Sequence, residues 1–292
     1  MDADQLTADL DTQPDHTHDS STGWSQVNVE FHDWTCAAKT TAAHLQPILD
    51  THTRAWWYIR KYPHWRIRYL RPADEVDHHV HAALCDLVAV ERLRAWHHAI
   101  YEPEARAFGG IAGMAIAHDL FRRDSPTALA LLTTSASTAT RTPSSATHGR
   151  AEVSVLAISR MLRAARLDWF EQGDVWARVA DLRQEPGEPH PAPPTDAVAA
   201  MRRLLTIDTS PVSPLLRDGP LVGHAAWLAA FDDTGTRLAD LAKSGHLNRG
   251  LRAVLAHHVI FHWNRLALTR RRQLALASLA RDDLLPTDLD TP

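Results

Sequence analysis

The chain has 292 residues, of which 45% are hydrophobic and 23% are charged, and its formal net charge is −4. This length is enough to bury a large core, and this composition excludes wholesale disorder. The small negative charge argues against a general binder of nucleic acid or of membrane surfaces.

The two cysteines, Cys36 and Cys85, provide neither a disulfide framework nor a cysteine-based zinc motif. Residues 1–23 are acidic and polar and lack the charged-then-apolar pattern of a secretion signal. No apolar run reaches the roughly 20 residues of a membrane span. We therefore expect a disordered acidic tail over 1–23, a cytoplasmic protein, and no membrane or nucleic-acid partner.

The first structured elements are predicted to be strands around a helix. Residues 24–31 alternate well enough for a strand, and residues 35–50 form an alanine-rich helix that stops near Pro47. Two further strands, over 55–60 and 64–70, flank a turn at 61–63 and form a hairpin.

The second strand of this hairpin has two different faces. It alternates three large apolar or aromatic residues with three cationic or ionisable ones: Trp65, Ile67 and Tyr69 against His64, Arg66 and Arg68. Paired arginine donors suit carboxylate or amide oxygens, so the cationic face is a candidate binding surface. The alternative is a solvated edge strand whose arginines resist aggregation.

The segment YEPEARAFGG, residues 101–110, follows a helix over 72–93 and a mixed aromatic and polar stretch over 95–102. Its two glycines allow a close approach that a side chain would block. Glu102 and Glu104 either are solvated, pair with Arg66 and Arg68, or orient a site through that pairing. A tyrosine such as Tyr101 can donate a hydrogen bond to an amide oxygen.

The rest of the chain reads as helices separated by short connections. We expect helices over 111–123, 125–132, 155–169, 176–183, 197–205, 221–232 and 236–244. Residues 133–149 are predicted as a surface loop and 184–196 as a proline-rich connector. The pairs His118-Asp119 and Asp124-Ser125 are interpreted as helix caps.

The last long helix begins after Gly245, has Asn248 as its cap and runs past Arg270. It places His258, His262 and Arg265 on the face where a core helix would carry aliphatic residues. Because buried imidazoles and guanidiniums need partners, this stripe faces a cavity, meets acidic partners, or is a structural hydrogen-bonded stripe. A zinc site is weakly supported, since no third ligand is evident.

The predicted architecture is an α+β fold, a mostly antiparallel sheet flanked by helices. We expect one domain over 24–272, followed by a charged tail over 273–292.

Four separated motifs carry a family resemblance: WWYIRKYPHWRIRYL, YEPEARAFGG, AHDLFRRDSPTALALL and HWNRLAL. Together they resemble the thiopeptide-type bacteriocin biosynthesis domain over most of residues 24–268. That domain is shared by the small glutamate-elimination domain of lantibiotic dehydratases and by thiopeptide pyridine synthases. The resemblance implies a lantibiotic-dehydratase-like α+β fold.

Two departures from the eliminating branch favour the pyridine synthases. Eliminating relatives carry an acidic residue, an arginine and a tyrosine before the glycine pair, where this chain has Arg106, Ala107 and Phe108. They also tend to carry a histidine four residues before the asparagine of the last motif, where this chain has Ile260.

The implied reaction joins two dehydroalanines and an intervening backbone amide in a formal aza-Diels–Alder cyclisation. Loss of water and of the leader peptide as an amide then forms the pyridine. The partner would be a thiazole- and dehydroalanine-containing precursor peptide with its leader, and no metal or other cofactor is required. The alternatives are the elimination subunit of a split dehydratase and a non-catalytic leader-binding module.

Our own expectation for the site combines the hairpin with the last helix, as walls of one pocket. Tyr101 or Tyr58 would donate to the amide oxygen, His262 would shuttle protons, and Glu102 would assist. The expected substrate-binding residues are His64, Arg66, Arg68, Glu104, His258, Asn264 and Arg265.

Overall fold

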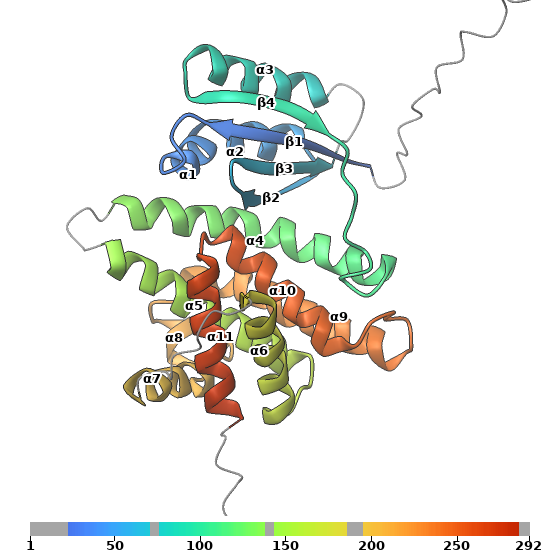
Figure 1. Ribbon diagram of the computed structural model, residues 1–292, viewed down its shortest axis with the longest axis vertical. Helices are drawn as coiled ribbons and strands as arrows, with labels where there is room; N and C mark the ends of the chain where they lie inside the picture. The colour runs from blue at the N-terminus through green and yellow to red at the C-terminus, as the bar shows by residue number, and fades with distance from the viewer. Residues whose placement is uncertain (1–22, 71–75, 138–142, 186–194, 286–292) are drawn as a thin grey trace, which may run out of the picture.

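The computed structural model describes residues 23–70, 76–137, 143–185 and 195–285. Its sheet has four antiparallel strands in the order β2-β3-β1-β4 (Figure 1). Their bounds are Trp24–Phe31 for β1, Ala55–Lys61 for β2, His64–Leu70 for β3 and Leu93–Ala99 for β4. The predicted α+β fold and the hairpin are confirmed.

Short helices cover one face of this sheet. They are α1 (Ala37–Thr40), a π-helical turn (Thr41–Leu45), α2 (Gln46–His52) and α3 (Val76–Ala89). Trp65, Ile67 and Tyr69 of β3 pack into this core, as the alternation predicted. The helix does not stop at Pro47, which lies in the first turn of α2, where a missing N–H has no cost. The expected start of α3 at 72–75 lies outside the described residues.

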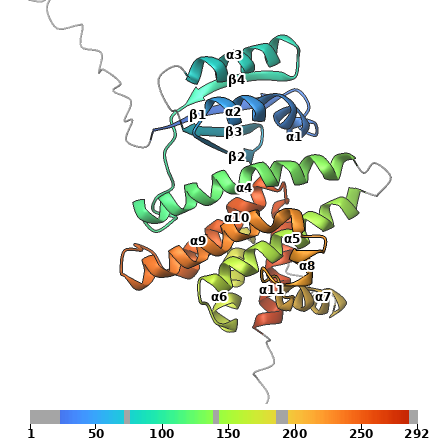
Figure 2. The same ribbon diagram turned by 180° about the vertical axis from the view of Figure 1, so that it is seen from behind.

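One long helix, α4 (Ile111–Ser137), runs beneath β2 between the sheet and the remaining helices (Figures 1 and 2). The prediction of two helices with caps near residue 124 is wrong. Ser125 lies inside α4, where its hydroxyl donates to the Phe121 carbonyl at 2.8 Å, and Pro126 is accommodated in the same helix. The predicted loop over 133–149 is also wrong, because α4 extends to Ser137 and α5 starts at Pro143.

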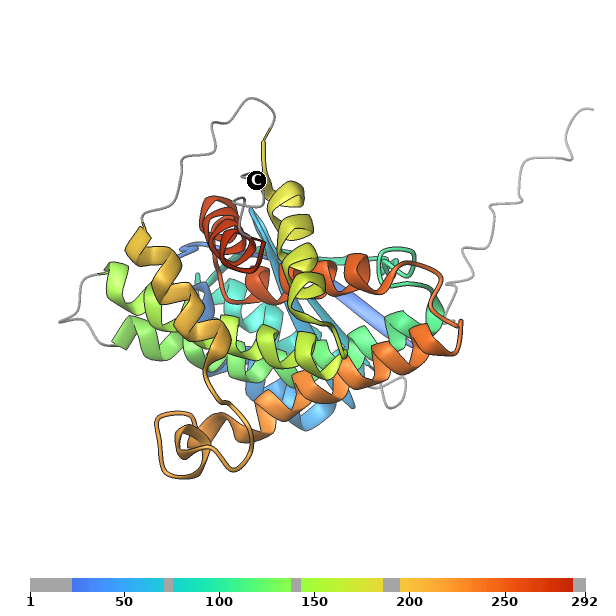
Figure 3. The same cartoon turned by 90° about the horizontal axis from the view of Figure 1, so that it is seen from below.

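A helical half completes the molecule below α4. Its elements are α5 (Pro143–Ala164), α6 (Trp169–Arg183), α7 (Thr195–Thr206), α8 (Pro214–Arg217), a 3₁₀ turn (Val222–His224), α9 (Ala225–Lys243), α10 (Leu251–Arg265) and α11 (Arg270–Leu284). Seen from below, α6 and α11 lie side by side (Figure 3). Of the predicted proline connector, residues 186–194 lie outside the described ranges.

The end of the chain differs from the prediction. The last long helix breaks after α10, where Ala267 has a positive φ of 58° and Thr269 caps α11 by accepting from the Arg272 N–H. Residues 273–284 are therefore not a tail, since they form most of α11, and the last residue of this helix, Leu284, is fully buried. Asn248 does not cap α10, whose N-cap is Gly250. The expected tails over 1–22 and 286–292 lie outside the described residues.

Candidate functional site

The cationic face of β3 is not a solvated edge, because β3 pairs with β1 on one side and with β2 on the other. Arg68 is only 2% exposed. Its Nε donates to Gln26 Oε1 at 2.6 Å, and its guanidinium carbon lies 4.3 Å from the ring centroids of both Trp57 and Tyr101. Arg68 is thus a fixed, largely desolvated cation held against two aromatic rings.

Glu104 reaches this cation from the segment before α4. Its Oε1 lies 3.8 Å from Arg68 Nη2, which realises the predicted pairing of a glutamate with the arginine face. Burial lowers the pKa of Arg68, and the charge of Glu104 opposes that shift. The second carboxylate oxygen of Glu104 is buried and has no hydrogen-bond partner within the described part of the chain.

Tyr101 and His118 form a second polar pair beside Arg68. The Tyr101 hydroxyl and His118 Nε2 share a hydrogen bond of 2.7 Å. Burial raises the pKa of Tyr101 well above its ordinary value, and burial followed by the charge of Arg68 lowers the pKa of His118 to about 4. At neutral pH the phenol is therefore protonated and the imidazole is neutral, so the hydrogen bond joins two uncharged groups.

An open hollow of about 700 Å³ lies beside Glu104. It is lined by residues 103–107 and by Asn248 and Arg249, which precede α10. Gly110, with a φ of 103°, packs closely against Asn248 of this lining, and a side chain on Gly110 would run into Asn248. The volume lies within the range of small-molecule and peptide side-chain pockets.

The histidine stripe of α10 does not open into this hollow. His258, His262 and Arg265 are fully buried. Asp124 of α4 accepts hydrogen bonds from Arg265 Nε at 2.6 Å, from His262 Nδ1 at 2.8 Å and from the Trp227 indole at 2.8 Å. The expectation that the hairpin and the histidine stripe wall one open pocket is therefore wrong, because the hollow is lined by residues 103–107 and by Asn248 and Arg249, which precede α10.

Other expected site residues are also dispersed. The buried Tyr58 hydroxyl donates to the Arg265 carbonyl at 3.2 Å, which places it in the interior. Asn264 accepts from Gln273 of α11, and Glu102 is exposed. His64 lies beside His97 of β4, and Arg66 is half-buried on the same sheet face as Arg68.

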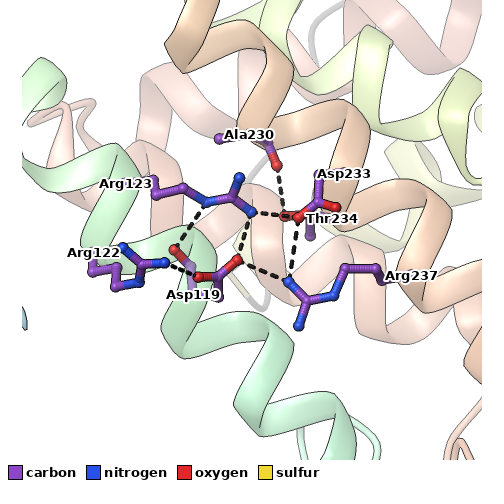
Figure 4. A network of polar contacts seen from close by, with 7 residues as sticks. All are labelled: Asp119, Arg122, Arg123, Ala230, Asp233, Thr234 and Arg237. Carbon is purple, nitrogen blue, oxygen red and sulfur yellow. Dashed lines mark hydrogen bonds and ion pairs between the residues drawn. The ribbon is translucent and has the colours of Figure 1, made fainter.

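Sequence reasoning missed three residues of these clusters: His118, Asp124 and Arg249. The first two were interpreted as caps because they occur around a predicted helix end, and their partners lie in other segments of the chain. Asp119, the neighbour of His118, faces away into an ion-pair network with Arg122, Arg123, Asp233 and Arg237 that joins α4 to α9 (Figure 4).

Neither a metal centre nor a membrane span emerges from the described residues. In those ranges no group of three or more histidine, cysteine, aspartate or glutamate side chains is placed to hold a metal ion. Likewise, none of the described helices combines the length and apolar character needed to cross a bilayer.

Comparison with known proteins agrees with this architecture. The family profile described as the C-terminal part of lantibiotic biosynthesis dehydratases matches residues 24–284. Among curated protein sequences, none matches the chain.

Solved structures share the fold at low sequence identity. The tRNA-dependent lantibiotic dehydratase MibB from Microbispora sp. 107891 is 18% identical with a TM-score of 0.54, over 94% of this chain and 28% of MibB. TsrL is 15% identical with a TM-score of 0.60, over 89% of this chain and 95% of TsrL. TbtD, the pyridine synthase from thiomuracin biosynthesis, is 14% identical with a TM-score of 0.57, over 89% of this chain and 97% of TbtD.

Proposed function

The chain belongs to the lantibiotic dehydratase C-terminal family, and on that premise we propose that it is a peptide-modifying enzyme that forms the central pyridine of a thiopeptide-type precursor. In this reaction carbon–carbon bonds form between two dehydroalanines and the carbon of an intervening amide. The amide oxygen leaves as water, and the leader peptide leaves as a carboxamide. The pyridine synthase TbtD shares the fold, which supports this choice of reaction.

The observation that carries the proposal is the cluster behind the wall of the hollow. Glu104 lines the hollow and pairs with Arg68, whose guanidinium contacts the ring of the protonated Tyr101. Formation of an imidic acid from an amide needs an acceptor for the N–H proton and a donor to the oxygen. We assign the acceptor role to Glu104 and the donor role to Tyr101, with Arg68 holding the peptide carbonyl oxygens.

The position of Arg249 supports glutamate elimination as a second candidate activity. Eliminating relatives carry an arginine where this chain has Ala107, but Arg249 donates to the Ala107 carbonyl at 3.3 Å. A guanidinium therefore reaches the same wall of the hollow from the residues before α10. This arrangement offers a cation for a departing glutamate carboxylate.

Mass spectrometry of a defined substrate tests the proposal. Purified protein is incubated with a thiazole-containing peptide that carries a leader and two dehydroalanines, with a known pyridine synthase as the positive control. We expect release of the leader as its amide together with a smaller macrocycle. An unchanged linear peptide, under conditions where the control turns over, contradicts the assignment.

Substitution of Glu104 tests the site. We expect Glu104→Gln to slow macrocycle formation by about 100-fold or more, because it removes a proton acceptor. The matched control is Glu152→Gln, an exposed glutamate on α5. Equal rates for the two variants would remove Glu104 from the mechanism.

The same assay distinguishes the alternatives. Loss of glutamate from a glutamylated serine or threonine, without a macrocycle, identifies the eliminating activity. Leader binding without either mass change identifies a non-catalytic binding module.

A further inference from the structure

The inner face of α10 contains an unusual concentration of unbonded nitrogen atoms. Both ring nitrogens of His258, Nε2 of His262 and both terminal nitrogens of Arg265 are buried and have no hydrogen-bond partner among the residues that the structure describes. All three side chains are fully buried. A buried donor or acceptor without a partner costs about 1–3 kcal/mol, so five such nitrogen atoms in one cluster call for a reason.

Asp124 satisfies only one edge of this cluster. It accepts from Nε of Arg265 and from Nδ1 of His262. The guanidinium carbon of Arg265 lies 4.5 Å from the centroid of the Phe121 ring, and the His258 ring lies 6.1 Å from the same ring. Unbonded donors of Arg265 and His258 are therefore grouped around one aromatic side chain.

Phe108 separates this cluster from the hollow. Its fully buried ring contacts the His258 ring edge-to-face at 4.9 Å and the Phe261 ring at 5.1 Å. The preceding residue, Ala107, lines the hollow. The following residues, Gly109 and Gly110, have φ values of 83° and 103°, a backbone region that glycine adopts without a side-chain penalty.

We propose that His258 and Arg265 form a closed binding site for one amide carbonyl oxygen of the substrate, and that Phe108 is its plug. A swing of Phe108 about the glycine pair would open the hollow to the unbonded donors. The inference rests on the proposed function, because it names the group of the peptide that the site binds.

Charge balance selects a neutral oxygen over a carboxylate. The charge of Arg265 is already matched by Asp124 at 2.6 Å, so an added anion would be the second negative charge in a buried site. Burial, followed by the charge of Arg265, lowers the pKa of His258 to about 3, so this imidazole is a neutral donor at pH 7. An amide carbonyl gains hydrogen bonds there without adding charge.

Histidine ¹⁵N NMR on the full chain tests this site without any enzymatic turnover. In Phe108→Ala, N-methylacetamide should shift the His258 ring signals saturably, with a dissociation constant at least tenfold lower than that of acetate. Wild-type protein and Phe170→Ala, which truncates an exposed phenylalanine, should show no saturable shift at His258. If Phe108→Ala does not fold, Phe108→Leu provides the same comparison.

Two outcomes overturn the inference: no saturable shift of His258 in a folded Phe108 variant, or acetate binding as tightly as the amide. Neither outcome depends on the macrocyclisation assay. Conversely, amide binding at His258 in a protein that forms no macrocycle keeps the carbonyl site and removes its link to pyridine formation.

Discussion

Asp124 accepts hydrogen bonds from three side chains on two other helices, so we expect its substitution to destabilise the fold. Burial alone raises the pKa of Asp124, but the nearby His262 and Arg265 side chains and the hydrogen bonds from His262 and Trp227 bring it well below the ordinary value. We expect Asp124→Asn to lower the free energy of unfolding by about 3–5 kcal/mol, because it leaves the buried Arg265 without a counter-charge. Urea denaturation measures this effect.

The control for that measurement is Asp240→Asn. Asp240 pairs with Arg166 at the surface, where both side chains are more than half exposed, and such pairs contribute about 0–1 kcal/mol. Similar losses in the two variants would show that Asp124 is not an interior counter-charge.

His118 and His258 give the stability of the protein a pH dependence. Their folded pKa values are lowered from 6.5 to about 4 and about 3, mainly by burial. As the pH falls below 6.5, the unfolded chain binds protons first, so stability is complete above that value and is lost toward the folded pKa values. Each histidine contributes up to about 1.4 kcal/mol per pH unit in that window.

Substitution of His258 tests its share of this pH dependence. We expect His258→Leu to reduce the slope of unfolding free energy between pH 6 and pH 4, and His44→Gln, at an exposed histidine, to leave it unchanged. A slope for His258→Leu equal to that of the wild type would mean that this imidazole is hydrated in the folded protein.

At the level of single residues, the sequence predicted which side chains share a face, but it did not predict which side chains on other elements they bind. Alternation along β3 correctly predicted that Arg68 lies on the other face of the sheet from Trp65 and Tyr69, because successive side chains of a strand point to opposite faces. The anomaly of His258, His262 and Arg265 on an apolar helix face was also visible. Their partner Asp124 could not be recognised from the sequence, because it lies 138 residues before His262 and meets it only when α4 and α10 pack together.

Among the elements, α9 shows why a glycine can continue a helix. Gly235 divides the predicted helices 221–232 and 236–244, yet α9 passes through it without a break. A Cβ on Gly235 would collide with the Met161 carbonyl of α5, so glycine is needed for close packing of the two helices. Sequence periodicity could not reveal this, because the neighbour comes from another helix.

A pair of glycine substitutions tests this packing. We expect Gly235→Ala to lower the free energy of unfolding by about 1–3 kcal/mol through overpacking against α5. Gly223→Ala is the control, because an added Cβ there meets no atom within 4 Å. Thermal denaturation compares them, and equal melting temperatures would contradict the close contact.

Strands were easier to predict than helix ends. The hairpin strands were placed within one residue because alternation and a proline turn are local signals. The helix end predicted near Ser125-Pro126 was wrong. A proline and a capping residue favour a helix end, but tertiary packing of the following turn can override this local preference. In α4 that turn places Leu129 and Leu132 in the sheet core.

On the scale of the whole molecule, α4 joins the sheet to the helical half. Its residues contact β2 above and α9 below, and the ion-pair network around Asp119 links it to α9 (Figure 4). The hollow lies where the segment leading from β4 into α4 meets the residues before α10. Both halves therefore contribute to the candidate site, which explains why the sequence of the hairpin alone could not predict its position.

The helical half is closed by α11, the element that the sequence analysis interpreted as a tail. The Asp283 side chain is fully buried and accepts from Arg202 of α7 at 2.7 Å. Its neighbour Asp282 is partly exposed and pairs with the adjacent Arg281. Two consecutive aspartates of α11 thus have different surroundings, one buried and one partly exposed.

We expect Asp283→Asn to lower the free energy of unfolding by about 1.5–3 kcal/mol, because it removes a charge-assisted hydrogen bond from a buried position. Asp282→Asn should stay within about 0.5 kcal/mol of the wild type, as surface substitutions usually do. Urea denaturation followed by circular dichroism measures both. A tail would tolerate the two changes equally, so equal stabilities would contradict the docking of α11, whereas a selective loss in Asp283→Asn makes this helix part of the cooperative fold that supports α10 and the hollow.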